Sequence, residues 1–173
     1  MRITEEAKRA LAEALYWAEV RGEPIEPLTD RYPGLTVREA YEIQLLVLER
    51  KLREGGRVVG KKIGLTSPAM QQLLGVDQPD YGHLLEGMAV PSGGVIERGR
   101  LIQPRIEGEI AFLLGRDVVG PGVGMEEVLE ATEWVAPALE VIDSRILGWR
   151  IRLADTIADN ASSGVFVVGE ERV

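Results

Sequence analysis

Three glutamates lie inside two otherwise apolar segments of this sequence and could together hold a metal ion. Glu107 and Glu109 are two residues apart in the segment 106–114, with Gly108 between them. In a β-strand, residues i and i+2 project from the same face, so the two carboxylates are expected side by side. Neighbouring carboxylates on an apolar sheet repel one another and are costly to desolvate unless a cation lies between them. The alternative for this pair alone is a strand face exposed to solvent.

A third acid favours the metal interpretation. Glu140 ends the apolar run that starts at Trp134, and Val141 and Ile142 follow it. Three carboxylates on two strands would form an oxygen-rich site for Mg²⁺ or Mn²⁺, with water and substrate at the remaining positions. The sequence has no cysteine and one histidine, so thiolate ligands and sites with several histidines are excluded.

The overall composition excludes other classes of partner. The 173 residues carry 20 Lys+Arg and 28 Asp+Glu, a net charge of −8, with 45% hydrophobic residues. This balance is typical of a globular protein and unfavourable for binding nucleic acid or an anionic membrane. No apolar run is long enough to span a bilayer, and the N-terminus lacks the apolar stretch of a secretory signal. We therefore expect a cytoplasmic location.

Residues 1–56 are expected to form an N-terminal helical region. Apolar residues recur every three or four positions over 5–21, and Gly22 follows as a helix stop. A second helix should begin after Thr36, because Thr36 and Glu39 have the spacing of a capping box. Gly55 should end this helix.

Residues 57–173 are expected to form a mixed β catalytic core. The predicted strands are 58–65, 106–114, 135–142 and 165–168, the predicted helices begin at Ser67–Pro68 and at Met125, and 76–85 is predicted to be a loop. The strands do not alternate regularly with helices. The sequence thus predicts an α+β fold, with a helical layer followed by a curved mixed sheet or barrel-like core.

Five ordered blocks of the sequence resemble one enzyme family. They are residues 60–67, 75–82, 103–111, 137–145 and 155–163. They are similar to motifs of the 2-hydroxypenta-2,4-dienoate hydratases and 4-oxalocrotonate decarboxylases, within the fumarylacetoacetate hydrolase superfamily. The resemblance covers essentially the whole chain and implies a core of that superfamily's type. The family normally continues with a substantial segment beyond the position of Val173, so the core is expected to be incomplete at its C-terminus.

The resemblance implies roles for individual residues. It implies that the three glutamates bind Mg²⁺ or Mn²⁺, that Lys62 and Asp80 are catalytic, and that Ser162 contacts the carboxylate end of the substrate. An ammonium group can stabilise a developing enolate oxygen, and a carboxylate can move protons between carbon and solvent. Without the resemblance, Lys62 would be read as a solvated residue at a strand end. Asp80 would be read as a turn former after Pro79.

The implied reaction is the addition of water to 2-hydroxypenta-2,4-dienoate-type substrates, giving 4-hydroxy-2-oxo acids, in the catabolism of aromatic ring-cleavage products. The alternative within the family is decarboxylation of 4-oxalocrotonate, which the ligand residues alone do not separate from hydration. A further alternative is a truncated or non-catalytic subunit that only binds a partner. The family resemblance also favours a homo-oligomer, and a complex with the partner hydratase or decarboxylase is a further expectation.

Overall fold

The computed structural model describes residues 3–173, apart from the side chains of Met70, Leu73, Leu74 and Arg98. Its first third is helical, with α1 (Glu5–Arg21), α2 (Leu28–Arg31) and α3 (Val37–Arg53). The predicted end of α1 is confirmed, because Gly22 adopts the left-handed conformation and its N–H bonds back to the helix. The capping box of Thr36 and Glu39 is also confirmed at the start of α3.

The remainder contains two antiparallel sheets and three short helices. β1 (Val58–Gly64) pairs with β2 (Asp80–Leu85), and β4 (Thr132–Ile142) lies between β3 (Arg105–Leu114) and β5 (Val165–Val168). The helices are α4 (Pro68–Leu74), α5 (Met125–Ala131) and α6 (Leu153–Ala158). The predicted α+β class is thus confirmed. The short helices α2 and α6 were not predicted.

The prediction of a loop over 76–85 is wrong for its second half, which forms β2. Its backbone partners come from elsewhere in the chain: β1 pairs along its length, and two α3 side chains bind the backbone of Tyr81. The Tyr41 hydroxyl accepts from the Tyr81 N–H at 3.2 Å, and the Gln44 amide donates to the Tyr81 carbonyl at 3.1 Å. The prolines and acids before Asp80 gave no indication of these distant partners.

The expectation of a mixed sheet is also corrected. All ladders between the named strands are antiparallel, and parallel pairing is limited to isolated bridges, Ile25 with Ile146 and Ala89 with Phe166. Antiparallel pairing requires no helical crossover, which fits the absence of regular strand–helix alternation. Closure into a barrel stays a prediction.

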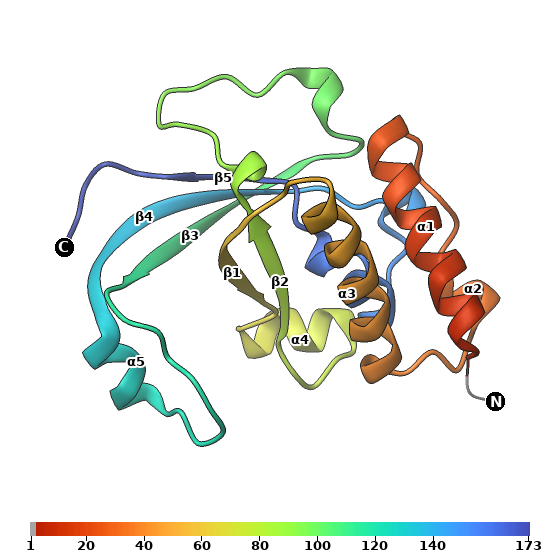
Figure 1. Cartoon of the computed structure of the whole chain (residues 1–173), viewed down its shortest axis with the longest axis horizontal. Helices are drawn as coiled ribbons and strands as arrows, with labels where there is room; N and C mark the ends of the chain where they lie inside the picture. The colour runs from red at the N-terminus through yellow and green to blue at the C-terminus, as the bar shows by residue number, and fades with distance from the viewer. Residues whose placement is uncertain (1–2) are drawn as a thin grey trace.

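The main hydrophobic core lies around α3, which packs against both α1 and α6. Leu15, Ile43 and Ile157 are almost fully buried there and belong to one cluster. Figure 1 shows α1 and α3 beside each other at the N-terminal end of the molecule, with the later segments behind α3. The core therefore crosses the expected boundary at residue 56. The division of the chain into regions 1–56 and 57–173 stays a prediction.

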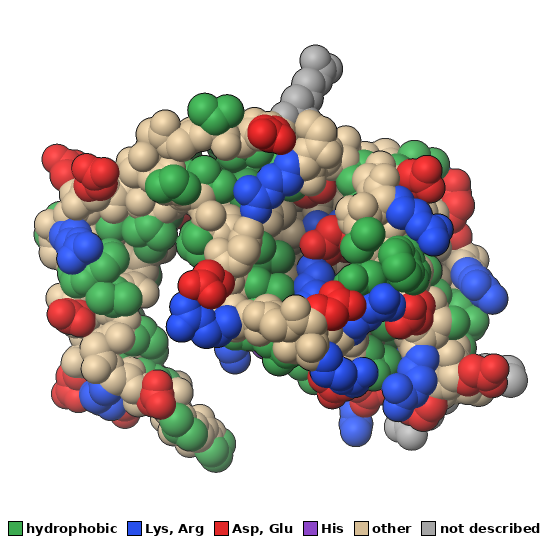
Figure 2. All heavy atoms as spheres, turned by 45° about the horizontal axis from the view of Figure 1, so that its top comes forward, with side chains coloured by type: hydrophobic (Ala, Val, Ile, Leu, Met, Phe, Trp, Pro, Cys, Tyr) green, Lys and Arg blue, Asp and Glu red, His purple; other side chains and the backbone are tan. Residues whose placement is uncertain are grey.

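The β3–β4 hairpin extends away from this core. Its outer end carries α5, and Figure 1 shows the two long strands curving away from the helices. Figure 2 shows this part as an arm that a deep indentation separates from the rest of the molecule. Ile106, Ile110 and Phe112 of β3 are more than half exposed, at 67%, 66% and 53%. Within residues 3–173, no helix combines the length and the apolarity needed to cross a membrane.

Candidate metal centre

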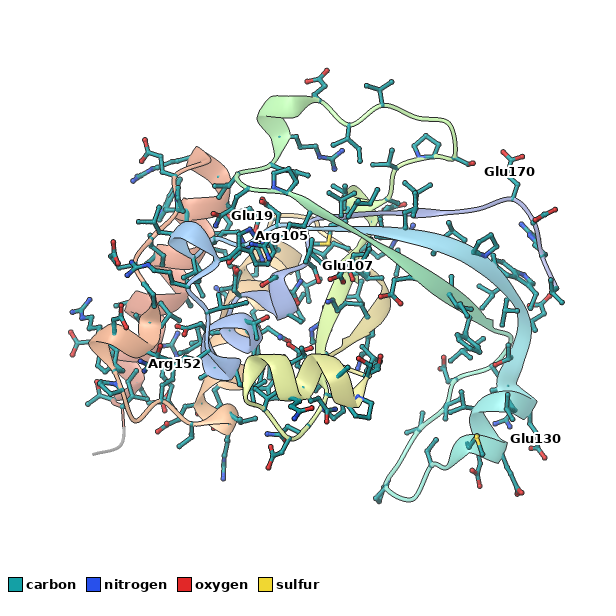
Figure 3. The ribbon with its side chains drawn as sticks, turned by 180° about the vertical axis from the view of Figure 1, so that it is seen from behind. Glu19, Arg105, Glu107, Glu130, Arg152 and Glu170 are labelled. Atoms are coloured by element: carbon teal, nitrogen blue, oxygen red, sulfur yellow. The ribbon has the colours of Figure 1, made fainter. Side chains whose placement is uncertain are left out.

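The pairing of β3 with β4 brings the three predicted metal ligands together. Glu107 lies directly opposite Glu140 in the ladder, and Glu109 lies opposite Ala138. One carboxylate oxygen from each of the three glutamates lies within 4.8 Å of the other two. Figure 3 shows Glu107 on the stretch of β3 near the middle of the molecule, far from Glu130 on α5. Glu109 is exposed, Glu107 is partly buried and Glu140 is buried.

The environment of Glu140 fits a bound cation. Its Oε1 is buried and is the only such side-chain atom in the described part of the chain without a hydrogen-bond partner. Burial raises the pKa of Glu140, the neighbouring Lys62 opposes this rise, and Glu107 and Glu109 add to it. Like charges directly opposite each other in a sheet are destabilising. A divalent cation would remove the repulsion and satisfy the buried oxygen, and an all-carboxylate donor set suits a hard cation.

The second sheet brings Lys62 to this cluster. The Lys62 Nζ atom lies 3.3 Å from Glu140 Oε2, and both side chains are largely buried. Lys62 is therefore not the solvated strand-end residue that an arbitrary lysine would be. The contact also shows that β1 and β4 face each other at the site, although they belong to different sheets.

Asp80 lies on the same face of the β1–β2 pair as Lys62. It is buried, and burial raises the pKa of its carboxyl group while Lys62 opposes the rise. A carboxyl group in this environment retains its proton to higher pH than a solvated aspartate. Its place within β2 excludes the reading of Asp80 as a turn former after Pro79.

Ser162 ends a tight turn in which three consecutive residues other than glycine are left-handed. The φ angles of Asn160, Ala161 and Ser162 are 55°, 51° and 53°. Such conformations are unfavourable and persist only where the surroundings impose them. Here the Asn160 side chain accepts from the His83 N–H at 2.8 Å and donates to the His83 carbonyl at 2.9 Å, which fastens the turn to β2.

Thr156 connects Ser162 with Asp80 and was missed by the sequence reasoning. The hydroxyl oxygens of Thr156 and Ser162 are 3.2 Å apart, and both residues are buried. Hydrogen bonding from Thr156 also lowers the pKa of Asp80. The only signal in the sequence was that Thr156 lies within the block 155–163.

A buried ion pair between Arg145 and Asp159 stabilises the turn at residues 160–162. Arg145 donates to the Asp159 carboxylate and to the backbone carbonyls of Asp143, Asp159 and Ser163. Burial raises the pKa of Asp159, and Arg145 opposes the rise. The guanidinium thus ties together the ends of β4, α6 and the turn before β5.

The three carboxylates lie beside a buried lysine and a buried aspartate at a point where two sheets meet, and this arrangement is a candidate cation site in an α+β protein. No protein-family model matches the chain. It is 52% identical to a 2-hydroxypent-2,4-dienoate hydratase of Pseudomonas putida over 164 residues, which are 94% of this chain and 74% of that protein. It is 51% identical over 159 residues to a 2-hydroxyhexa-2,4-dienoate hydratase of Comamonas testosteroni, covering 91% of this chain and 60% of that protein.

A solved structure has the same fold. The 4-oxalocrotonate decarboxylase from Pseudomonas putida G7, complexed with magnesium and adipate, superposes with a TM-score of 0.95 at 38% identity. The match covers 99% of this chain and 65% of that one. The chain therefore belongs to the family of 2-hydroxypenta-2,4-dienoate hydratases and 4-oxalocrotonate decarboxylases. It spans 60% to 74% of the length of the two curated relatives.

Proposed function

We propose that the protein is a divalent-metal-dependent hydratase that adds water to 2-hydroxypenta-2,4-dienoate-type substrates and gives 4-hydroxy-2-oxo acids. The observation that carries this proposal is the cluster of Glu107, Glu109 and Glu140 with its partnerless buried oxygen and the adjacent Lys62. The curated relatives at about half identity are named as hydratases, which favours hydration over other lyase reactions.

The side chains suit the two demands of the reaction, stabilisation of negative charge and movement of protons. A cation held by the three glutamates would polarise the oxygens of a 2-oxo acid. The Lys62 ammonium group donates to the oxygen at C2 as negative charge develops there. Asp80, with its raised pKa, gives its proton to the terminal dienol carbon while the C2 hydroxyl proton passes to solvent. The Asp80 carboxylate then takes a proton from the water that attacks C4, and C3 receives a proton from solvent, so the net change is the addition of one water.

Ser162 is proposed to donate to the carboxylate end of the substrate. Its support is the rigid turn, which fixes the hydroxyl beside Thr156 and near the end of β2. Ser162→Ala would therefore raise KM more than it lowers kcat. A fall in kcat at constant KM would assign the hydroxyl to the chemical step instead.

The proposed cofactor is Mg²⁺ or Mn²⁺. The similar decarboxylase was solved in complex with magnesium and adipate and in complex with calcium and acetate, which supports a hard divalent cation. Activity measured with each ion added to chelator-treated protein identifies the one that supports turnover. Activity in the presence of excess chelator would contradict the proposal.

Decarboxylation of 4-oxalocrotonate is the second candidate, because the structural match to a decarboxylase covers nearly the whole chain. The test is to incubate the protein and metal separately with 2-hydroxypenta-2,4-dienoate and with 4-oxalocrotonate, following loss of the dienol and release of CO₂. Hydration of the first substrate supports the hydratase. Release of CO₂ without hydration would assign the decarboxylase. If neither reaction is observed, the result would favour a non-catalytic binding subunit.

We further propose that the protein acts in the catabolism of aromatic ring-cleavage products in the cytoplasm, as a homo-oligomer. The small dienoate substrates in the names of the relatives support the catabolic role. A complex with the partner hydratase or decarboxylase belongs to the same proposal. Light scattering of the purified protein, alone and mixed with that partner enzyme, tests both forms of assembly.

A further inference from the structure

Two functional residues and two glycines alternate on one face of the β1–β2 pair. Lys62 lies opposite Gly82, and Gly64 lies opposite Asp80. Because side chains two residues apart share a face, all four positions project to the same side. The two functional side chains therefore lie on one diagonal, and each is opposite a residue without a side chain.

The space above Gly64 is occupied by the groups that the reaction would use. A Cβ atom at this position would lie 2.4 Å from Asp80 Oδ1 and 3.3 Å from Lys62 Nζ. The first distance is shorter than real Cβ contacts allow. The φ angle of Gly64 lies outside the left-handed region, so the requirement for glycine comes from space and not from backbone conformation.

The Asp80 carboxylate has little freedom to move aside. Its side chain is only 4% exposed, and it is held between Lys62, the Thr156 hydroxyl and its own strand. An aspartate has a short side chain, so moving the carboxylate requires a rotamer change or a shift of β2. In a close-packed interior, both changes are costly.

We propose that Gly64 is a positioning residue, whose missing side chain lets the Asp80 carboxylate and the Lys62 ammonium group approach each other over the strand. This inference rests on the proposed function for its catalytic consequence only. A methyl group at Gly64 would push the Asp80 carboxylate away from β1. It would also shift the Lys62 Nζ atom and so disturb its 3.3 Å contact with Glu140 Oε2.

The chain provides two matched control substitutions. At Gly60, on the same face of β1, an added Cβ would meet only Leu84 Cδ1 at 3.8 Å, an ordinary contact. At Gly108, between two of the proposed metal ligands, an added Cβ would meet nothing within 4 Å. Gly60→Ala and Gly108→Ala therefore make the same chemical change without the collision.

The first experiment measures hydration kinetics of these variants with saturating metal. Gly64→Ala is expected to lower kcat on the order of 100-fold, because misplacement of a catalytic group by about 1 Å has an effect of this size. Gly60→Ala and Gly108→Ala should stay within about threefold of the native protein, as changes without a collision do. Native kcat in Gly64→Ala would overturn the inference. Absence of turnover by the native protein would count against the proposed function alone.

The second experiment needs no activity and tests the collision itself. Melting temperatures are compared for the native protein, Gly64→Ala, Asp80→Ala and the double variant, all without metal. Gly64→Ala should lower the melting temperature by about 2–10 °C in the native background and not in the Asp80→Ala background. Equal losses in both backgrounds would overturn the inference. If Gly64→Ala does not fold, folding of the double variant supports the inference and its failure to fold contradicts it.

Discussion

The helical core and the β3–β4 arm of this protein are stabilised in different ways. In the core, α1, α3 and α6 bury residues such as Ile43, which is 0% exposed. In the arm, β3 exposes large apolar side chains such as Ile110, and α5 packs on the hairpin end away from the helices. The arm thus depends on its strand pairing, whereas the core depends on burial.

The candidate site contains residues from both of these regions. Asp80 and Ser162 belong to the well-packed region, where Asn160 and Arg145 fix the backbone by several hydrogen bonds. Glu107 and Glu109 belong to the exposed arm. Glu140 is the proposed ligand at which the two regions meet, because Lys62 contacts it from the other sheet. A cation bound there would connect the acids of the β3 strand to the well-packed region that holds Asp80.

Removing a charge should destabilise the two regions to very different extents, and Arg145 should show the largest effect. Arg145→Met should destabilise the fold by about 3–5 kcal/mol, because it leaves the Asp159 carboxylate buried and unpaired. Arg116→Met in the arm removes only an exposed pair with Glu130 and should cost about 0–1 kcal/mol. Urea unfolding measures both. Similar losses for the two variants would show that the regions do not differ as described.

Truncating one isoleucine in each region isolates the contribution of packing. Ile43→Ala should destabilise the protein by about 2–5 kcal/mol, since it leaves a cavity in the core. Ile110→Ala should change stability by no more than about 0.5 kcal/mol, because this side chain is 66% exposed. Urea unfolding again measures both losses. The slope of the unfolding free energy against urea concentration should not change. A large loss for Ile110→Ala would mean that the outer face of β3 is covered in solution.

Glu140 should determine whether metal binding stabilises the protein. At a metal concentration 100 times Kd, Mg²⁺ or Mn²⁺ should stabilise the native protein by about 2.7 kcal/mol, seen as a rise in melting temperature. Glu140→Gln should abolish this rise, because it removes the buried ligand between the two regions. Glu133→Gln on the exposed side of the same strand is the control and should keep it. A metal-induced rise in Glu140→Gln equal to the native one would exclude Glu140 as a ligand.

The smallest predicted effect is a pH dependence of metal affinity. Burial raises the pKa of Glu140, so a proton competes with the cation over a higher pH range than at a solvated glutamate. Affinity should therefore rise with pH, by up to about tenfold per pH unit for one displaced proton, and then level off. Without metal, the stability of the fold depends on pH in the opposite direction. The raised pKa of Glu140 favours the folded state at low pH, and this contribution is lost as the pH rises through that pKa.

Calorimetric titration of Mn²⁺ at several pH values measures this dependence. Proton release on binding, detected as a dependence of the heat on buffer, is the direct signature. Affinity that is constant from about pH 5 to pH 7 would indicate that Glu140 is already ionised in the metal-free protein, contrary to its environment.

The elements with strong local signals were predictable from the sequence. The helix over 5–21 has an apolar stripe and a terminal glycine, and the start of α3 has its capping box, so both follow from interactions between neighbours in the chain. β2 was missed because its stabilising partners, β1 and the α3 side chains Tyr41 and Gln44, are 16 or more residues away. The prolines and acids in the segment 76–85 instead predicted a loop.

The sequence by itself determined the chemistry of the proposed metal centre and one part of its geometry. The absence of cysteine, the single histidine and the alternation of side chains along a strand select carboxylates and place Glu107 beside Glu109. The tertiary structure decided that Glu140 faces Glu107, that Lys62 approaches from another sheet, and that Gly64 leaves space for Asp80. Strand register and sheet packing depend on contacts between segments far apart in the chain, so no local pattern specifies them.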